Sequence, residues 1–168
     1  EDLDTESEFR SLKGSSTSDA VSVEVDGDGV IGTYSVQVNS IASSEMEVSN
    51  GFSSKTALGT IGTGNLVINY GGQSTTLTVG NLDSSLNGLA SLINDNVDGV
   101  TAYVMDTGDA STPYRLVISG NDTGADYTID IDATGLTGGS AVQPSFTEAM
   151  TAQDSEVVIN GIPITDSN

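Results

Sequence analysis

Acidic residues gather in three short clusters, and their oxygen atoms are the groups in this sequence most suited to binding a metal ion. The clusters are DGDG at 26–29, DTGD at 106–109 and NDTGADYTIDID at 121–132. A Ca²⁺ ion needs roughly six to eight converging oxygens, and none of the clusters has the acidic spacing of an EF-hand loop. Asp-Gly pairs also form turns by capping their own backbone. We therefore interpret the clusters as turns, and keep a low-affinity calcium site in a calcium-dependent surface adhesion module as the alternative.

Three aspartates of the last cluster could act as paired carboxylates. Asp126, Asp130 and Asp132 have even sequence separations, which would place them on one face of a strand. Two carboxylates held about 5 to 9 Å apart in a cleft hydrolyse glycosidic bonds. A metal-free glycosidase is therefore a competing hypothesis. The chain has no Trp, and only 5 Tyr and 3 Phe, to stack against a sugar, so a solvated strand face is the stronger interpretation.

The lack of His and Cys removes most other chemistry. A serine nucleophile would have no His base, and thiolate nucleophiles, disulfides and soft-metal sites are excluded together. The Gly-rich passage GTIGTGN at 59–65 has no Lys of a phosphate-binding loop, so we interpret it as a linker. The sequence therefore nominates no catalytic, cofactor-binding or metal-binding residue and no cofactor, and predicts that the protein is not an enzyme.

The charge balance argues against polyanionic partners. Asp and Glu number 24 and Lys and Arg only 4, which gives a formal net charge of −20. Such a chain has almost no cations with which to bind phosphate backbones or anionic headgroups. No apolar run approaches the ~20 residues that span a bilayer. We therefore expect neither a nucleic acid nor a membrane as partner.

The strands that carry these polar groups should pack against one helix. Its apolar side chains recur at helical spacing and are Leu82, Leu86, Leu89, Ala90, Ile93 and Val97. Asp83 or Ser84 is the expected N-cap, Gly99 follows the end, and Asn94 should face water. A helix with a single apolar stripe must cover one face of a sheet.

Alternating patterns and turn signals predict several antiparallel strands. A hairpin should join 20–25 to 33–41 through the DGDG turn, and a second should join 65–70 to 75–79 through Gly71 and Gly72. The alternating pattern is absent from residues 43–64, which we interpret as a segment that crosses into a second unit. Later strands are expected at 100–105, 114–119 and 127–131, and a Gly-rich passage from 134 to 144 should end this unit. A short helix at 146–154 and a strand at 156–164, turned at Asn160-Gly161, should follow.

These elements predict an α+β fold that is mostly β. Its parts are antiparallel strands and hairpins, with one amphipathic helix packed on a sheet. The low aromatic content, 5%, favours two small domains over one with a thick core.

Three segments, taken in order, resemble the bacterial flagellar filament cap family, FliD or flagellar hook-associated protein 2. GTYSVQVNSIASSE at 32–45 resembles a strand element near that family's N-terminal leg, and AQDSEVVINGIPITDSN at 152–168 resembles its return segment. The stretch at 64–124, from GNLVINYGG to YRLVISGNDTG, resembles the family's "IN" motif, and Ile93-Asn94 matches the dipeptide that gives the motif its name.

The resemblance implies a domain organisation and a role. Residues 1–16 would be a residual leg or linker, 17–48 with 147–168 a discontinuous first head domain, and 49–146 an inserted second head domain. The family's members form an oligomeric cap at the tip of the extracellular filament, where the cap promotes folding and insertion of exported flagellin. The implied partners are other cap subunits and flagellin, and the implied function is structural.

Overall fold

The computed structural model describes residues 12–19, 21–26, 29–141 and 143–168. The chain divides into two compact units, Glu1–Ser35 and Val36–Asn168. The described residues of the first unit form no helix or strand. Most of the expected leg, residues 1–11, lies outside the described residues, as does Ala20.

The hairpin expected between 20–25 and 33–41 is wrong. Strand β1 (Val36–Ser40) begins later than expected and pairs antiparallel with β9 (Ser155–Ile159), which in turn pairs with β10 (Ile162–Asp166). The β9–β10 hairpin turns at Asn160 (φ 50°) and Gly161 (φ 84°), as predicted. This hairpin provides β1 with an antiparallel edge that has matching aliphatic side chains, which explains the choice of partner.

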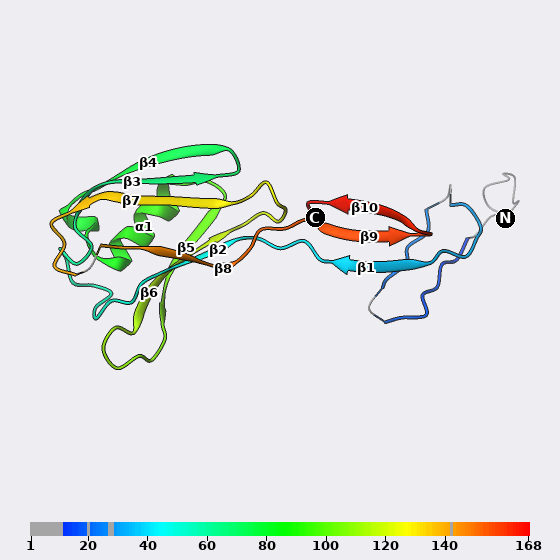
Figure 1. Ribbon diagram of the computed structural model, residues 1–168, viewed down its shortest axis with the longest axis horizontal. Coiled ribbons are helices and arrows are strands. Elements are labelled where there is room, and N and C mark those ends of the chain that lie inside the picture. The colour runs from blue at the N-terminus through cyan, green and yellow to red at the C-terminus, as the bar shows by residue number, and fades with distance from the viewer. Residues whose placement is uncertain (1–11, 20, 27–28, 142) are drawn as a thin grey trace, which may run out of the picture. The chain divides into compact units, whose positions relative to one another are not determined.

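A four-stranded antiparallel sheet has the order β5-β6-β2-β8 (Figure 1). Strands β5 (Val100–Asp106) and β6 (Tyr114–Gly120) confirm the strands expected there. β2 (Met46–Ser49) lies inside the segment expected to have no strand, and β8 (Phe146–Met150) replaces the expected helix at 146–154. Both corrections have one cause, because β2 pairs with β6 on one side and with β8 on the other. Pairing between distant segments leaves little local pattern in either sequence.

A second sheet has the order β4-β3-β7. β3 (Thr63–Tyr70) and β4 (Gln73–Val79) form the predicted hairpin, with Gly71 and Gly72 at φ 55° and 79°. β3 includes residues 63–65 of the passage interpreted as a linker. β7 (Ile129–Thr137) begins two residues after the expected strand and continues through 134–137, which were expected to be a Gly-rich end. Pairing with β3 along its whole length extends β7.

Helix α1 (Leu86–Asn96) begins later than expected. Its N-cap is Ser85, whose Oγ accepts a hydrogen bond from the Gly88 N–H, and not Asp83 or Ser84. The Ser84 hydroxyl is already used, since it accepts from the Gly59 N–H and donates to the Asn81 carbonyl. Leu82 therefore falls in a separate 3-10 turn, Asn81–Asp83, and is 81% exposed, so its assignment to the apolar stripe is wrong.

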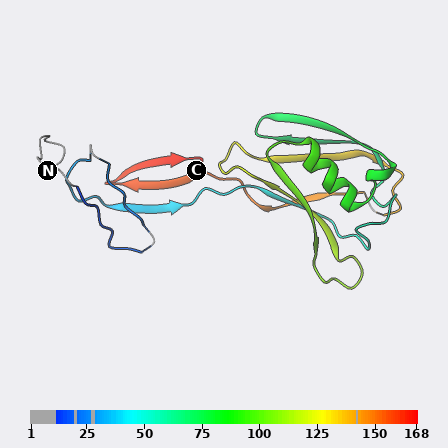
Figure 2. The same ribbon diagram turned by 180° about the vertical axis from the view of Figure 1, so that it is seen from behind.

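The core of the second unit lies between the two sheets and around α1 (Figures 1 and 2). The helix contacts β4, β5 and β6 through its buried stripe, which is Leu86, Leu89, Ala90, Ile93 and the following Val97. The fold is α+β and mostly β, as predicted. Among the described residues, no helix has the length and apolar character needed to cross a membrane.

Candidate functional site

Residues 27 and 28 of the first acidic cluster lie outside the described residues, so the structure describes the clusters at 106–109 and 121–132 in full and the first only in part. Within the described residues, no group of three acidic side chains is placed to hold a metal ion. In the 106–109 cluster, Asp109 Oδ1 accepts the N–H groups of Thr112 (2.8 Å) and Ser111 (2.9 Å), and these bonds lower the pKa of the Asp109 carboxyl. Asp106 Oδ1 accepts the Gly108 N–H in the same way. These bonds are those of a loop that caps its own backbone.

The three aspartates considered for glycoside hydrolysis are all exposed. Asp130 and Asp132 lie on one face of β7, whereas Asp126 precedes the strand. Asp130 accepts a hydrogen bond from the Asn69 amide at 2.9 Å. Bonds from the Thr134 hydroxyl and N–H lower the pKa of Asp132. A general acid for this reaction needs a raised pKa, so the lowered pKa of Asp132 is the opposite of what that role requires.

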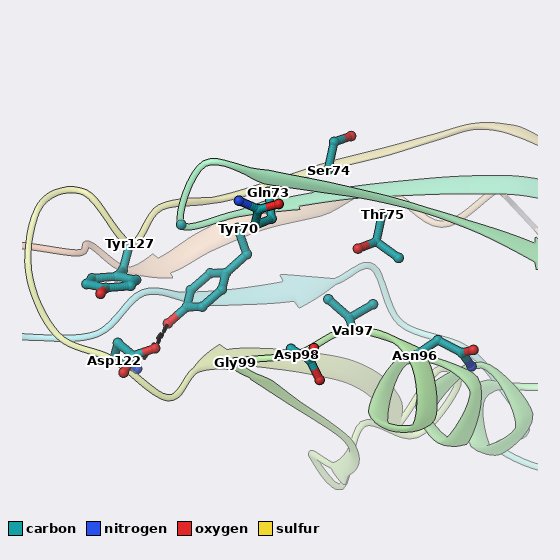
Figure 3. Close-up of a pocket in the computed structure, with 11 residues that line it drawn as sticks. Tyr70, Gln73, Ser74, Thr75, Asn96, Val97, Asp98, Gly99, Asp122 and Tyr127 are labelled. Atoms are coloured by element: carbon teal, nitrogen blue, oxygen red, sulfur yellow. Dashed lines mark hydrogen bonds between the residues drawn. The ribbon is translucent and has the colours of Figure 1, made fainter.

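A cleft of about 350 Å³ lies beside Tyr70, at the end of β3 (Figure 3). The Tyr70 hydroxyl donates to Asp122 Oδ2 at 3.2 Å and accepts the Asp122 N–H at 3.0 Å. The Tyr70 and Tyr127 rings lie 5.7 Å apart, tilted by 41°. Burial raises the pKa of the Tyr70 hydroxyl. Both hydrogen-bonding functions of this hydroxyl are occupied within the protein, which makes it a structural group.

Two glycines hold the Tyr70 ring in place. A Cβ atom at Gly120 would lie 2.9 Å from Tyr70 Cε2, and one at Gly99 would lie 2.6 Å from Tyr70 Cε1. Gly99 also has a φ of 78°, which side chains rarely adopt. The close packing of Tyr70 on these glycines joins the end of β3 to the ends of α1 and β6. The cleft is therefore a by-product of a packed junction.

The sheet β1-β9-β10 has one aliphatic face. Directly paired residues of an antiparallel sheet share a face. The register therefore groups six side chains, which we call the aliphatic face: Val36, Val38, Val157, Ile159, Ile162 and Ile164. Ile162 is 66% exposed and Val38 is 51% exposed. The opposite face carries polar groups such as Asn39, which donates to Glu156 Oε1 at 2.8 Å. An exposed aliphatic face of this kind is a candidate surface for contact with another polypeptide.

The outer face of the four-stranded sheet is a second apolar surface. All 3 methionines of the chain, Met46, Met105 and Met150, lie on it together with Tyr103, and we call these four side chains the methionine face. The core residue Ile118 points to the other side of the same sheet. Methionine adapts its shape to different partners and is common at binding surfaces. This face was not anticipated from the sequence, because the three methionines lie on three separate strands.

Asn94 is a further residue whose role the sequence did not reveal. It is exposed, as expected, but its amide bonds both backbone groups of Ala102 on β5, the edge strand of its sheet. Asn94 Nδ2 donates to the Ala102 carbonyl at 2.8 Å, and Asn94 Oδ1 accepts the Ala102 N–H at 2.7 Å. The preceding Ile93 is fully buried against the same sheet. The Ile93-Asn94 dipeptide thus attaches the helix to the sheet by packing and by hydrogen bonds.

Comparison with known proteins agrees with the resemblance read from the sequence. No protein-family model matches the chain. The flagellar hook-associated protein 2 of Escherichia coli K12 is 26% identical over an alignment of 172 positions. The alignment covers 95% of this chain but only 36% of that protein. The flagellar cap protein FliD of Bdellovibrio bacteriovorus is 27% identical, with a TM-score of 0.71 over 84% of this chain and 80% of that structure.

A structure of the D2-D3 domains of FliD from Escherichia coli has the same fold. Its TM-score is 0.76 at 23% identity, covering 90% of this chain and 83% of that structure. The chain therefore spans about a third of the length of its full-length relative and most of the structure that contains only those two domains.

Proposed function

We propose that this chain, a relative of the flagellar cap proteins, is the head region of a structural component of the bacterial flagellum. The longer protein would form an oligomeric cap at the extracellular tip of the filament and promote the folding and insertion of exported flagellin. This region would act through its shape and contacts, with no catalytic step and no cofactor.

The observation that carries this proposal is the combined similarity of sequence and fold. At 27% identity the similarity to a solved cap protein extends over 84% of the chain. The similarity to a full-length relative extends over 95% of the chain. The role of the whole protein comes from those relatives, since this chain spans 36% of the relative's length. Nothing in the part of the chain that the structure describes favours the calcium-dependent adhesion module, and it is not proposed further.

We also propose that the chain comprises two head domains, the second inserted into the first. Support comes from two segments that run antiparallel to each other. β1 pairs with β9, the Ser43 N–H donates to the Gln153 carbonyl at 2.9 Å, and β2 pairs with β8. Such a double connection is what an insertion requires. β2 and β8 cross the boundaries expected at 48/49 and 146/147 and belong to the sheet with β5 and β6. Boundaries near 43 and 153 would therefore keep that sheet intact.

The proposed partners are other cap subunits and flagellin. Contacts with either need exposed apolar surface, which the aliphatic face and the methionine face offer. The formal charge of −20 makes faces without acidic side chains, such as these two, the places where two copies could approach with least repulsion.

Complementation in the organism that encodes the chain tests the proposal. Deletion of the gene should release flagellin monomers into the medium and abolish long filaments, and the intact gene should restore them. A gene that encodes Ile93→Asp should fail to restore them, because the substitution places a charge at a fully buried position. A gene that encodes Asp95→Asn, at an exposed position of the same helix, should restore them. Normal filaments in the deletion strain would contradict the proposed role.

A further inference from the structure

Two glutamates lie on the side of the four-stranded sheet that faces the core: Glu47 in β2, and Glu45 directly before it. Glu45 is 4% exposed and Glu47 is 9% exposed. Glu47 pairs directly with Ile118 of β6, a fully buried core residue, so the two side chains share a face. Ser49, two residues further on, is also buried on this face, where its hydroxyl accepts the Leu116 N–H at 2.8 Å. The inner face of β2 is therefore polar within an otherwise apolar interior.

A third glutamate comes from the neighbouring strand. Glu148 of β8 is the direct cross-strand partner of Glu47, which places two carboxylates on one face opposite each other. Like charges in this position repel. We call Glu45, Glu47 and Glu148 the carboxyl cluster.

The other charged groups around the carboxyl cluster do not neutralise it. Asp130, at the start of β7, adds a further negative charge that acts on Glu47. Of the described cations near this unit's sheets, the Arg115 guanidinium donates to the Ser49 carbonyl at 2.9 Å and the Lys55 ammonium lies 5.4 Å from the centre of the Tyr114 ring. The charges that act on Glu47 are those of Glu45, Glu148 and Asp130, and all are acidic.

The hydrogen bonds of the carboxyl cluster are incomplete. Glu45 accepts the N–H of Ile129, which links β2 to the start of β7 in the other sheet, and Glu148 accepts a hydrogen bond from the Thr151 hydroxyl. Glu47 Oε2 is buried and has no hydrogen-bond partner in the described structure. An ionised carboxylate in such a place is costly, and protonation removes the charge that burial penalises.

We propose that the carboxyl cluster binds a proton when this unit folds, with Glu47 as the group that holds it. The proton comes from solvent, adds to a carboxylate oxygen and forms a neutral carboxylic acid between the sheets. Folding is then coupled to proton uptake, so mild acid stabilises this unit and alkaline conditions destabilise it. The proposal does not depend on the flagellar role.

The direction of the pH effect follows from linkage. Burial, followed by the neighbouring carboxylates, raises the pKa of Glu47 above the ordinary value of 4.5, and burial also raises the pKa of Glu45. A raised carboxyl pKa means that the folded state binds more protons than the unfolded state. The stabilisation is therefore fully present below pH 4.5 and is lost as the pH rises through the folded-state pKa.

The test is urea denaturation of the 168-residue chain between pH 5 and pH 8.5, for the natural sequence, Glu47→Gln and Asp95→Asn. Gln has the size of Glu and needs no proton. Asp95 is an exposed helix residue, so its change removes one negative charge without touching the cluster. We expect the folding equilibrium constant of the natural chain to fall as the pH rises, and Glu47→Gln to exceed it by roughly tenfold at pH 8.5 for each unit of raised pKa. Asp95→Asn should keep the slope of the natural chain.

Two results would overturn the proposal. One is a natural chain whose stability is flat or rises between pH 5 and pH 8.5. The other is an equal loss of slope in Asp95→Asn, which would assign the effect to general charge repulsion. A direct measurement covers the case in which Glu47→Gln does not fold. The side-chain carboxyl ¹³C resonances of the natural chain should include a Glu that titrates well above the rest, and uniform titration near pH 4.5 would refute the proton site.

Discussion

Asn94 joins α1 to the edge of the four-stranded sheet, and its replacement by Ala should measure that connection. The Asn94 amide makes bonds of 2.8 and 2.7 Å to the carbonyl and N–H of Ala102. Because β5 is an edge strand, these two backbone groups have no neighbouring strand on that side. Asn94→Ala removes both partners at once and leaves α1 held by its apolar stripe and by the bond from the Asn87 N–H to the Lys55 carbonyl at its other end.

The magnitude follows from two opposing effects. A hydrogen bond of this type contributes about 0.5 to 1.5 kcal/mol, so the pair contributes about 2 kcal/mol. Ala is a better helix former than Asn, which returns about 0.6 kcal/mol. The net loss should be about 1.5 kcal/mol of unfolding free energy, or roughly a tenfold fall in the folding equilibrium constant.

Urea denaturation followed by circular dichroism would measure this loss, with Asn96→Ala as the matched control. Asn96 is exposed on the same helix, and its amide donates only to the Leu92 carbonyl within the helix at 2.8 Å. The control should change stability by less than about 0.5 kcal/mol. Equal effects of the two substitutions would refute the reasoning that Asn94 acts through the sheet edge.

Three further predictions concern the helix start, the Tyr70 junction and calcium. Ser85→Ala should cost about 1 kcal/mol of unfolding free energy because it removes the N-cap, whereas Ser91→Ala, at an exposed position of the same helix, should be neutral or mildly stabilising in the same denaturation assay. Gly120→Ala should cost about 1 to 3 kcal/mol, since its Cβ would lie 2.9 Å from the Tyr70 ring; an unchanged midpoint would show that the ring moves freely. Calorimetric titration with Ca²⁺ should give no binding heat and no rise in melting temperature, and a rise would favour the adhesion alternative.

The sequence predicted correctly those turns, hairpins and helical stripes that are determined by residues close together in the chain. The Gly71-Gly72 and Asn160-Gly161 turns have the positive φ values that such sequences favour, and both hairpins formed as expected. The stripe from Leu86 to Val97 was recognisable because helical spacing is a property of one continuous segment.

Elements that depend on distant partners were not predictable in the same way. β2 places Glu47 and Ser49 toward the core, so its pattern reads as a polar segment. Only pairing with β6 and β8 makes it a central strand. β1 likewise takes as its partner β9, which lies far along the chain, in place of a nearby segment.

The candidate surfaces could not be predicted from the sequence for the same reason. The aliphatic face needs the register of β1, β9 and β10, and the methionine face needs the order of four strands. The carboxyl cluster depends on the cross-strand partnership of Glu47 and Glu148, which are about a hundred positions apart in the sequence. No motif within a single segment could have revealed any of these groups.

The position of this protein on the cell distinguishes a filament cap from any other surface protein. Antibodies raised against the 168-residue chain, coupled to gold, can be applied to intact flagellated cells of the organism that encodes it and viewed by electron microscopy. If the protein is part of a filament cap, gold particles should lie at the free ends of filaments, and none should bind cells from which the gene has been deleted. Labelling spread over the cell body, or absent from filament ends, would contradict the cap role.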